Sequence, residues 1–272
     1  MRKNLYTFIV LLCISFETYS QELVNQYPVF KSGEKITYNA VYNWGFIWIK
    51  AGIVEFSVNE TEYFNEPAYH LIAAGVTIPS YDWLYKVRDY YQSYAQNEKL
   101  SPLLFSRNTY EGGYQVNNRY EFNYKDSTIN TKTKNTNKAY SEDTLIIKKK
   151  TYDVLSAVYL IRNIDFTQYA INDTIPVTVI IDNEILDLYI RYLGKEIIKT
   201  RDKRKFNTIK FSALLVEGTI FKGGEDLFVW VTNDLNRIPI LVEAKILVGS
   251  IKATLKKTEN LKFPLSSEII RE

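Results

Sequence analysis

The chain has 272 residues, a formal net charge of +3, and a composition that is 46% hydrophobic and 15% aromatic. This length suits one large domain or two small ones, and the apolar fraction excludes an intrinsically disordered chain. Basic and acidic residues are mixed throughout, so no stripe of Lys and Arg of the kind that binds nucleic acid is present. The densest basic run, residues 199–205, is interpreted as a solvated turn between strands.

The first twenty residues have the pattern of a cleavable export signal. Arg2 and Lys3 precede an almost wholly apolar run over residues 5–16, and Thr18 and Ser20 place small side chains at positions −3 and −1 of a cut before Gln21. The apolar run is shorter than the roughly 20 residues that a membrane-spanning helix needs. We therefore expect cleavage between residues 20 and 21, and export to the periplasm or the outer-membrane periphery.

Cys13 is the only cysteine, and it lies inside the apolar run. Removal of the signal would leave residues 21–272 without cysteine, which excludes disulfides, thiolate catalysis and cysteine metal sites. A lipid anchor on Cys13 is the alternative, but Leu12 stands where such sites need a small residue. We expect residues 21–272 to form a single β-rich domain without a transmembrane helix.

Alternating apolar and polar residues predict strands through the first half of the chain. The apolar side chains of Ile36, Tyr38 and Tyr42, for example, share one face of a strand. Further strands are predicted over residues 52–59, 68–78, 87–96, 103–110, 114–124 and 127–133. One helical turn is predicted near residues 80–84, and residues 130–143 are interpreted as an exposed hairpin tip or loop.

One segment predicts a helix instead. Asp153 is a suitable N-cap, and the apolar residues that follow have helical spacing up to Asn163. Strands resume over residues 175–181, 186–193, 196–200, 208–217, 226–232, 238–247 and 250–257. About a dozen strands with a single helix indicate antiparallel pairing, because parallel strands need crossover helices. The predicted fold is all-β and mainly antiparallel, a curved or closed barrel-like sheet with one central helix.

Most catalytic and metal-binding patterns are absent from the sequence. His70 is the single histidine and falls within a predicted strand, so neither a zinc site nor a Ser-His-Asp triad is supported. No P-loop or dinucleotide fingerprint occurs. The oxygen-rich turn around Asp234 lacks the full pattern of a calcium loop. No metal and no cofactor are predicted.

Paired carboxylates are the remaining catalytic possibility, because a glycan hydrolase needs only two acids at a set separation. Seven acids are candidates: Asp82, Asp89, Glu111, Glu217, Glu225, Asp226 and Asp234. Nothing in the sequence shows two of them facing one cleft, so no catalytic residue is assigned.

Aromatic residues are concentrated in the first third of the chain. The group consists of Trp44, Phe46, Trp48, Trp83, Tyr85, Tyr90, Tyr91 and Tyr94. Such side chains could line an apolar pocket for a lipid or form a platform for a sugar. A core built from Tyr and Trp is the alternative. The ligand-binding hypothesis rests on Trp44, Trp48, Trp83 and Tyr85.

Several short motifs resemble a bacterial exported family, domain of unknown function 3108. They cover residues 30–38 followed by 51–52, the predicted helix 153–162, and residues 229–234, 237–240 and 248–250. The resemblance implies export, a β-rich fold and no established activity. The cut before Gln21 is similar to exported proteins of Bacteroidetes-type bacteria.

The family motifs supply no catalytic residues. The matching positions are Gly33, Glu34, Asp153, Arg162, Trp230, Asp234, Arg237, Pro239 and Gly249. Turns suit Gly33 and Gly249, while Asp234 could pair with Arg237 and Trp230 could lie in the core. In the alternative interpretation, Arg162, Trp230, Asp234 and Arg237 form one polar site.

The leading hypothesis is an exported envelope protein, non-enzymatic, whose curved β domain binds an apolar or amphipathic ligand. A lipid, a glycan or another envelope protein could be the partner, and nucleic acid is not expected. The alternatives are a structural or assembly factor of the envelope and a carboxylate-dependent glycan hydrolase.

Overall fold

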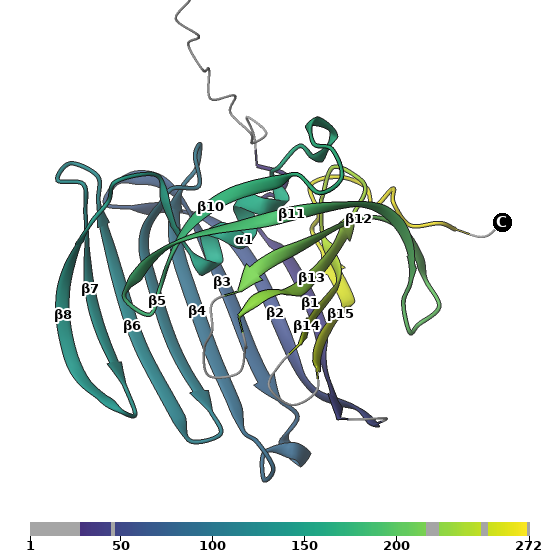
Figure 1. Ribbon diagram of the computed structural model, residues 1–272, viewed down its shortest axis with the longest axis horizontal. Helices are drawn as coiled ribbons and strands as arrows, with labels where there is room; N and C mark the ends of the chain where they lie inside the picture. Colours follow the sequence, from purple (N-terminus) through teal and green to yellow (C-terminus); the bar gives the residue numbers. More distant parts are fainter. Residues whose placement is uncertain (1–27, 45–46, 216–222, 246–249, 271–272) are drawn as a thin grey trace, which may run out of the picture.

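A computed structural model describes residues 28–44, 47–215, 223–245 and 250–270 (Figure 1). The expected signal, Phe46, Glu217 and Gly249 lie outside the described residues. Trp44 and Trp48 are described only as backbone within their strands.

The described residues form fifteen strands and one α-helix. The first half of the chain contains β1 (Glu34–Trp44), β2 (Ile47–Tyr63), β3 (Glu66–Thr77), β4 (Val87–Gln96), β5 (Pro102–Glu111), β6 (Tyr114–Asn123), β7 (Thr128–Asn135) and β8 (Lys138–Ile146). The second half contains β9 (Thr151–Asp153), α1 (Val154–Arg162), β10 (Thr174–Ile181), β11 (Glu184–Lys199), β12 (Lys205–Leu215), β13 (Gly224–Thr232), β14 (Pro239–Lys245) and β15 (Ser250–Glu259). Two short 3-10 turns are η1 (Pro79–Tyr81) and η2 (Phe166–Gln168).

All the strands belong to one sheet, in the order β8-β7-β6-β5-β4-β3-β2-β1-β15-β14-β13-β12-β11-β10-β9. Every pair is antiparallel except β9 with β10. The prediction of a mainly antiparallel, curved sheet with one central helix is therefore confirmed, and β8 and β9 remain the two edges of a sheet that does not close. The interval over residues 130–143 is a β7–β8 hairpin, so most of it is strand.

Strand β11 is longer than the sequence predicts. Alternation indicated two strands, over residues 186–193 and 196–200, but the structure has one strand of 16 residues. The register shifts between Tyr192 and Gly194, where Gly194 has a φ of +97°. A glycine at this backbone angle permits a β-bulge, which reverses the alternation without ending the strand.

We call β1–β8 the first arm of the sheet and β9–β15 the second arm. Away from the β1–β15 pair that joins them, the β10–β11 hairpin meets the first arm through side chains. Figure 1 shows β10 and β11 crossing in front of the strands of the first arm. At the hairpin tip, Asp182 and Asn183 have φ values of +46° and +72°, as a tight two-residue β-turn requires. Asp182 Oδ1 accepts hydrogen bonds from Arg107 at 3.1 Å and from Asn118 at 3.4 Å. These contacts hold the tip against β5 and β6.

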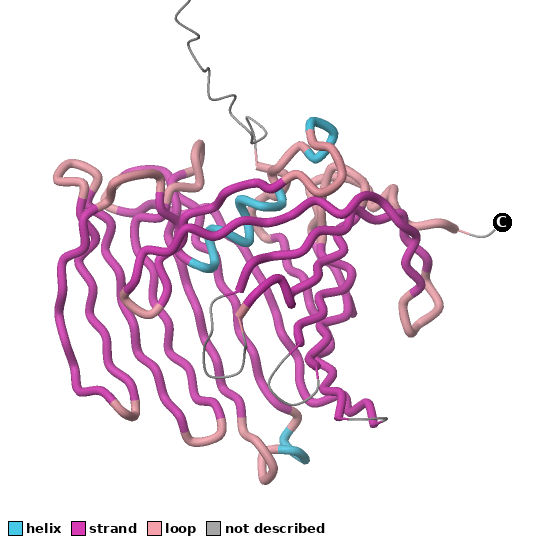
Figure 2. The backbone as a smooth tube through the Cα atoms, viewed as in Figure 1, coloured by secondary structure: helices cyan, strands magenta, loops and turns pink. Residues whose placement is uncertain are grey.

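Helix α1 lies on the concave side, where it contacts β3, β4, β9 and β10 (Figure 2). Its buried residues Leu155 and Tyr159 join a core formed by the inner faces of β3–β7. The predicted N-cap is confirmed: Asp153 Oδ1 accepts from the Leu155 and Ser156 amides at 2.8 and 2.9 Å. The predicted end at Asn163 is confirmed as the C-cap.

The Asp153 cap also ties the helix to the sheet, because Ser93 Oγ in β4 donates to Asp153 Oδ2 at 2.7 Å. Asp153→Ala should therefore lower the free energy of unfolding by about 2 kcal/mol, since the helix loses its cap and buried Ser93 loses its acceptor. Urea unfolding followed by circular dichroism measures this. Asp165→Ala, which removes an exposed cap of η2, is the control and should cost clearly less. Equal losses would contradict this role for Asp153.

Candidate functional site

The family-motif residues Glu34 and Arg162 form a buried ion pair between β1 and α1. Arg162 Nη1 lies 2.6 Å from Glu34 Oε1, and Nη2 lies 3.1 Å from Oε2. Their side chains are only 3% and 1% exposed. Arg162 also donates from Nε and Nη2 to the backbone carbonyl of Asn236, at 3.3 and 3.1 Å. A bidentate pair of this kind fixes both position and orientation of the guanidinium.

Aromatic rings surround this pair. The guanidinium carbon of Arg162 is 5.6 Å from the Phe30 ring centre and 5.5 Å from that of Tyr159. Burial raises the pKa of the Tyr38 and Tyr159 hydroxyls well above their usual range. Burial acts to lower the pKa of Arg162, but the charge and hydrogen bonds of Glu34 outweigh it, so the shift is upward. Both members of the pair have protein partners, which gives them a structural role.

Asp234 supports the turn that Arg162 contacts. Its Oδ1 accepts from Thr232 Oγ1 at 2.8 Å and from the Asn236 amide at 3.0 Å, while Oδ2 accepts from the Ser267 amide at 3.1 Å. The guanidinium of Arg237 instead lies over the Phe166 ring, 5.8 Å from its centre. Burial lowers the pKa of Arg237. Asp234 and Arg237, which were expected as a possible pair, therefore each make contacts with other groups.

The remaining family-motif residues lie in separate settings. Trp230 is buried, and its indole nitrogen donates to Glu196 Oε1 at 2.5 Å. Gly33 has a φ of +81° in the turn before β1, and Pro239 begins β14. In the described part of the chain, Arg162 and Asp234 are linked through Asn236, while the side chains of Trp230 and Arg237 contact Glu196 and Phe166.

Arg162→Met should lower the free energy of unfolding by about 3–5 kcal/mol, because it leaves the Glu34 carboxylate buried without its partner. The half-exposed pair of Arg204 with Glu268 offers a matched control. Arg204→Met should cost about 1 kcal/mol or less, because water solvates the carboxylate left behind. Urea unfolding of both variants makes the comparison. Similar losses at the two sites would show that burial does not set the energy of the pair.

A second polar group lies on the concave side of β4 and β5. The register pairs Asp89 with Thr109 and Val87 with Glu111, so the Asp89 and Glu111 side chains share a face. Burial, followed by the neighbouring Glu111 carboxyl, raises the pKa of Asp89 to about 7. The two carboxyls also share a hydrogen bond. Both acids are among the seven candidates in the sequence, but only the strand register brings them together.

Arg107 and the β10–β11 tip complete this polar group. The Arg107 guanidinium lies 5.8 Å from the ring centre of Tyr91, and burial raises the pKa of Tyr91 to about 12. Three buried polar atoms here lack a hydrogen-bond partner: Asp89 Oδ1, Arg107 Nε and Asn183 Oδ1. Buried donors and acceptors normally find partners. The cluster therefore has free hydrogen-bonding capacity; we call Asp89, Tyr91, Arg107, Glu111 and Asn183 the concave polar cluster.

Burial of the concave side changes along the strands. Near α1, the inner-facing Leu71, Phe105 and Tyr120 are 0–2% exposed. Toward the other end of the sheet, several inner-facing side chains of both arms are only partly buried, although Thr109 and Val116 remain just 1% and 4% exposed. The partly buried set consists of Val54, Asp89, Tyr91, Arg107, Glu111, Ala213, Leu227, Val242 and Ala253. The concave polar cluster lies at this incompletely filled end.

The structure places two of the aromatic candidates, Trp83 and Tyr85, outside this set. Trp83 is 81% exposed and Tyr85 is 48% exposed, both in the loop between β3 and β4. Tyr94 stacks on His70 at 4.3 Å between ring centres, and His70 is within β3 as predicted. Tyr91, by contrast, belongs to the concave polar cluster.

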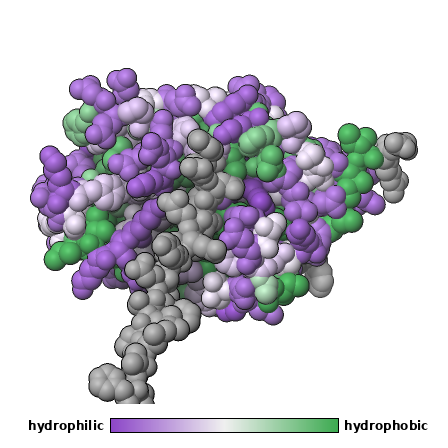
Figure 3. Space-filling model, turned by 90° about the horizontal axis from the view of Figure 1, so that it is seen from above, coloured by the Kyte–Doolittle hydropathy of each residue, from purple (hydrophilic) through white to green (hydrophobic). Residues whose placement is uncertain are grey.

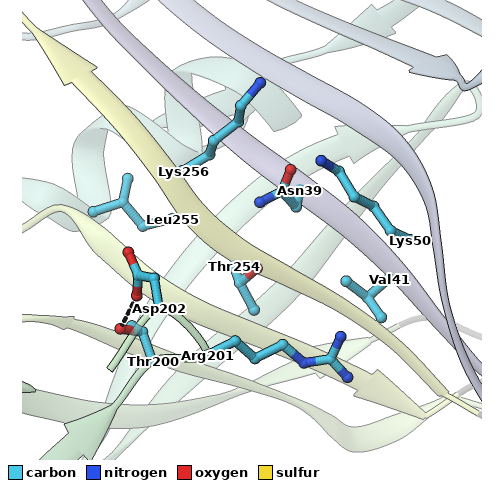
Figure 4. A pocket seen from close by; sticks show the side chains of 9 residues that line it. All are labelled: Asn39, Val41, Lys50, Thr200, Arg201, Asp202, Thr254, Leu255 and Lys256. Carbon is cyan, nitrogen blue, oxygen red and sulfur yellow. Dashed lines mark hydrogen bonds between the residues drawn. The ribbon is translucent and has the colours of Figure 1, made fainter. Parts of the chain in front are cut away.

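A pocket of about 270 Å³ lies elsewhere, between the β11–β12 turn and strands β1, β2 and β15 (Figure 4). Its lining residues are Asn39, Val41, Lys50, Thr200, Arg201, Asp202, Thr254, Leu255 and Lys256. Three cationic side chains and one carboxylate give the lining a net positive charge. The basic run at residues 199–205 is a turn between strands, as the sequence indicated.

Comparisons with known proteins agree with this architecture. The family model described as "Protein of unknown function (DUF3108)" matches residues 37–256. The fold is similar to a crystal structure of a beta-barrel-like protein of the domain of unknown function DUF1849 from Brucella abortus. That match has a TM-score of 0.54 and 10% sequence identity, and it covers 87% of this chain and 99% of the other. No curated protein matches the sequence. Among the described residues, no helix has the length and apolar character to cross a bilayer.

Proposed function

The chain belongs to the DUF3108 family of unknown function, and we propose that it is an exported envelope protein whose concave side binds an amphipathic ligand. The observation that carries the proposal is the concave polar cluster, with its unpartnered atoms at the incompletely filled end of the sheet. Export is supported by the basic and apolar pattern of the first twenty residues.

The apolar part of the ligand would contact the partly buried side chains of both arms. Val54 comes from β2, while Leu227 and Val242 come from β13 and β14. Contact with these side chains would remove apolar surface from water on both sides, which favours binding in proportion to the area covered. Binding sites for small molecules commonly combine such walls with a few polar groups that fix orientation.

The polar part of the ligand would meet the concave polar cluster. Arg107 Nε offers a donor, while Asp89 Oδ1 and Asn183 Oδ1 offer acceptors. Because the pKa of Asp89 is raised to about 7, its carboxyl also holds a proton for part of the time at neutral pH. A head group that both donates and accepts hydrogen bonds, such as a hydroxyl or an amide, fits this set better than a simple anion.

The geometry does not favour the glycan-hydrolase alternative. Carboxyls that share a hydrogen bond lie closer together than the separation of about 5 Å or more that glycosidase pairs use.

Arg107→Gln should weaken binding of a monoacylglycerol with a fluorescent acyl chain by about tenfold, because a charged hydrogen-bond donor is lost. A fluorescence titration measures the affinity. Arg119→Gln is the matched control and should bind as the wild type does, because Arg119 is exposed on β6 and pairs with Glu121 at 2.8 Å. Failure of the wild type to bind, or equal affinity in Arg107→Gln, would overturn the proposal.

The raised pKa of Asp89 gives a pH dependence of stability. Between the usual carboxyl pKa of 3.8 and the folded value of about 7, the folded state binds more protons than the unfolded state. The contribution of Asp89 to stability is therefore present below the unfolded pKa and is lost as pH rises toward 7. Asp89→Asn should remove this dependence, so that its stability relative to the wild type increases from pH 5 to pH 8.

Urea unfolding at several pH values measures this difference. Glu111→Gln should lower the pKa of Asp89, because it removes the neighbouring negative charge, so that the loss of stability with rising pH is smaller and ends at a lower pH. A difference in the free energy of unfolding between Asp89→Asn and the wild type that stays constant with pH would contradict the raised pKa of Asp89.

A further inference from the structure

The loop between β3 and β4, residues 78–86, exposes a group of apolar side chains. Trp83 is 81% exposed, Leu84 is 64% exposed and Tyr85 is 48% exposed. The loop contains η1 and extends from the end of the sheet opposite α1, at the bottom of Figure 1. The α1 end, seen from above in Figure 3, shows mainly hydrophilic residues with scattered apolar groups.

This loop is held firmly at its base. Arg88 Nη2 lies 2.5 Å from Asp82 Oδ2, and the Val87 amide donates to Thr77 Oγ1 at 3.1 Å. The hydrogen bond with Arg88 is the largest of the causes that lower the pKa of the Asp82 carboxyl. Trp83 and Leu84 are therefore exposed in a loop whose conformation these contacts hold in place.

A second brace comes from the β5–β6 turn. The Gly112 amide donates to the Lys86 carbonyl at 2.9 Å. A Cβ atom at Gly112 would lie 2.2 Å from the Tyr85 ring, so the ring packs directly on the glycine backbone. Tyr85 thus supports the loop from one side, while Trp83 and Leu84 remain at its tip. A pre-ordered tip loses little conformational freedom when it binds.

The chemistry of the tip matches a bilayer interface. Trp and Tyr are enriched where headgroups meet acyl chains, because their rings are apolar and their tips are polar. Leu84 adds apolar surface, and Lys86 is an exposed cation next to the tip. A long lysine side chain can place its charge at the headgroups while its stem lies along apolar surface. The tip protrudes from the sheet, so it suits a deformable surface such as a bilayer, into which it can insert.

We propose that residues 83–84 insert into the interfacial region of a phospholipid bilayer and dock the protein there, with Lys86 at the anionic headgroups. Asp89 begins the concave polar cluster only a few residues after this loop, so docking would turn the incompletely filled end of the sheet toward the lipid. The inference goes beyond the proposed ligand binding and holds without it.

Vesicle flotation tests the docking. Residues 21–272 should float with phosphatidylcholine vesicles that contain phosphatidylglycerol. The double variant Trp83→Ser/Leu84→Ser should lose about tenfold or more of this binding, because two large apolar side chains are removed. Phe64→Ser is the matched control: Phe64 is 87% exposed, but it lies in the β2–β3 turn at the other end of the sheet. This variant should float as the wild type does.

Two further measurements separate docking from other effects. Acyl chains brominated near the headgroup should quench wild-type tryptophan fluorescence, and Trp83→Phe should lose most of that quenching. Arg107→Gln should keep full vesicle binding, which distinguishes docking from ligand binding on the concave side. A wild type that floats with neither phosphatidylcholine nor mixed vesicles, or a Phe64→Ser loss equal to that of the double variant, would overturn the proposal.

Discussion

The ion pair between Glu34 and Arg162 connects parts of the chain that are far apart in sequence. Glu34 begins β1, Arg162 ends α1, and the Asn236 carbonyl belongs to the turn before β14. A buried arginine without these acceptors would be strongly destabilising, so the three segments must come together in one arrangement. The pair thereby fixes where the only α-helix of the described chain lies between the arms of the sheet. Glu34 and Arg162 are also two of the residues on which the resemblance to domain of unknown function 3108 rests.

Much of the fold could be predicted from local patterns. Alternation located most strands because one face of the sheet is buried, and Asp153 marked the helix start because capping acts within three residues. The long-range features could not be predicted this way. Asp182 approaches Arg107 across the sheet, a separation that no local pattern encodes. The Gly194 bulge likewise appeared as a strand end, because one extra residue changes the phase of the alternation.

The candidate site shows the same limit. Asp89 and Glu111 were two acids among seven, and only pairing of β4 with β5 brings their carboxyls together. The signal available in advance was weak: Asp89 lies in a predicted strand, whereas Glu111 comes directly after the strand predicted over residues 103–110. Trp83 was predicted to bind a ligand because aromatic residues are dense near it, but this density could not distinguish a residue that lines a pocket from one that protrudes. The exposed fractions distinguish the two cases. The concave polar cluster is partly buried on the concave side of the sheet, whereas Trp83 is exposed in the loop between β3 and β4.

The strand order has a kinetic consequence. β1 pairs with β2 on one side and with β15 on the other, so the first and last strands are neighbours in the middle of the sheet. Each arm is a run of local hairpins that can form early, but the central seam joins residues more than two hundred positions apart. Contacts of such long range slow folding, because the intervening chain must be ordered before they form. Until β15 arrives, β1 and β14 present open hydrogen-bonding edges, which are the surfaces most prone to pairing with another molecule.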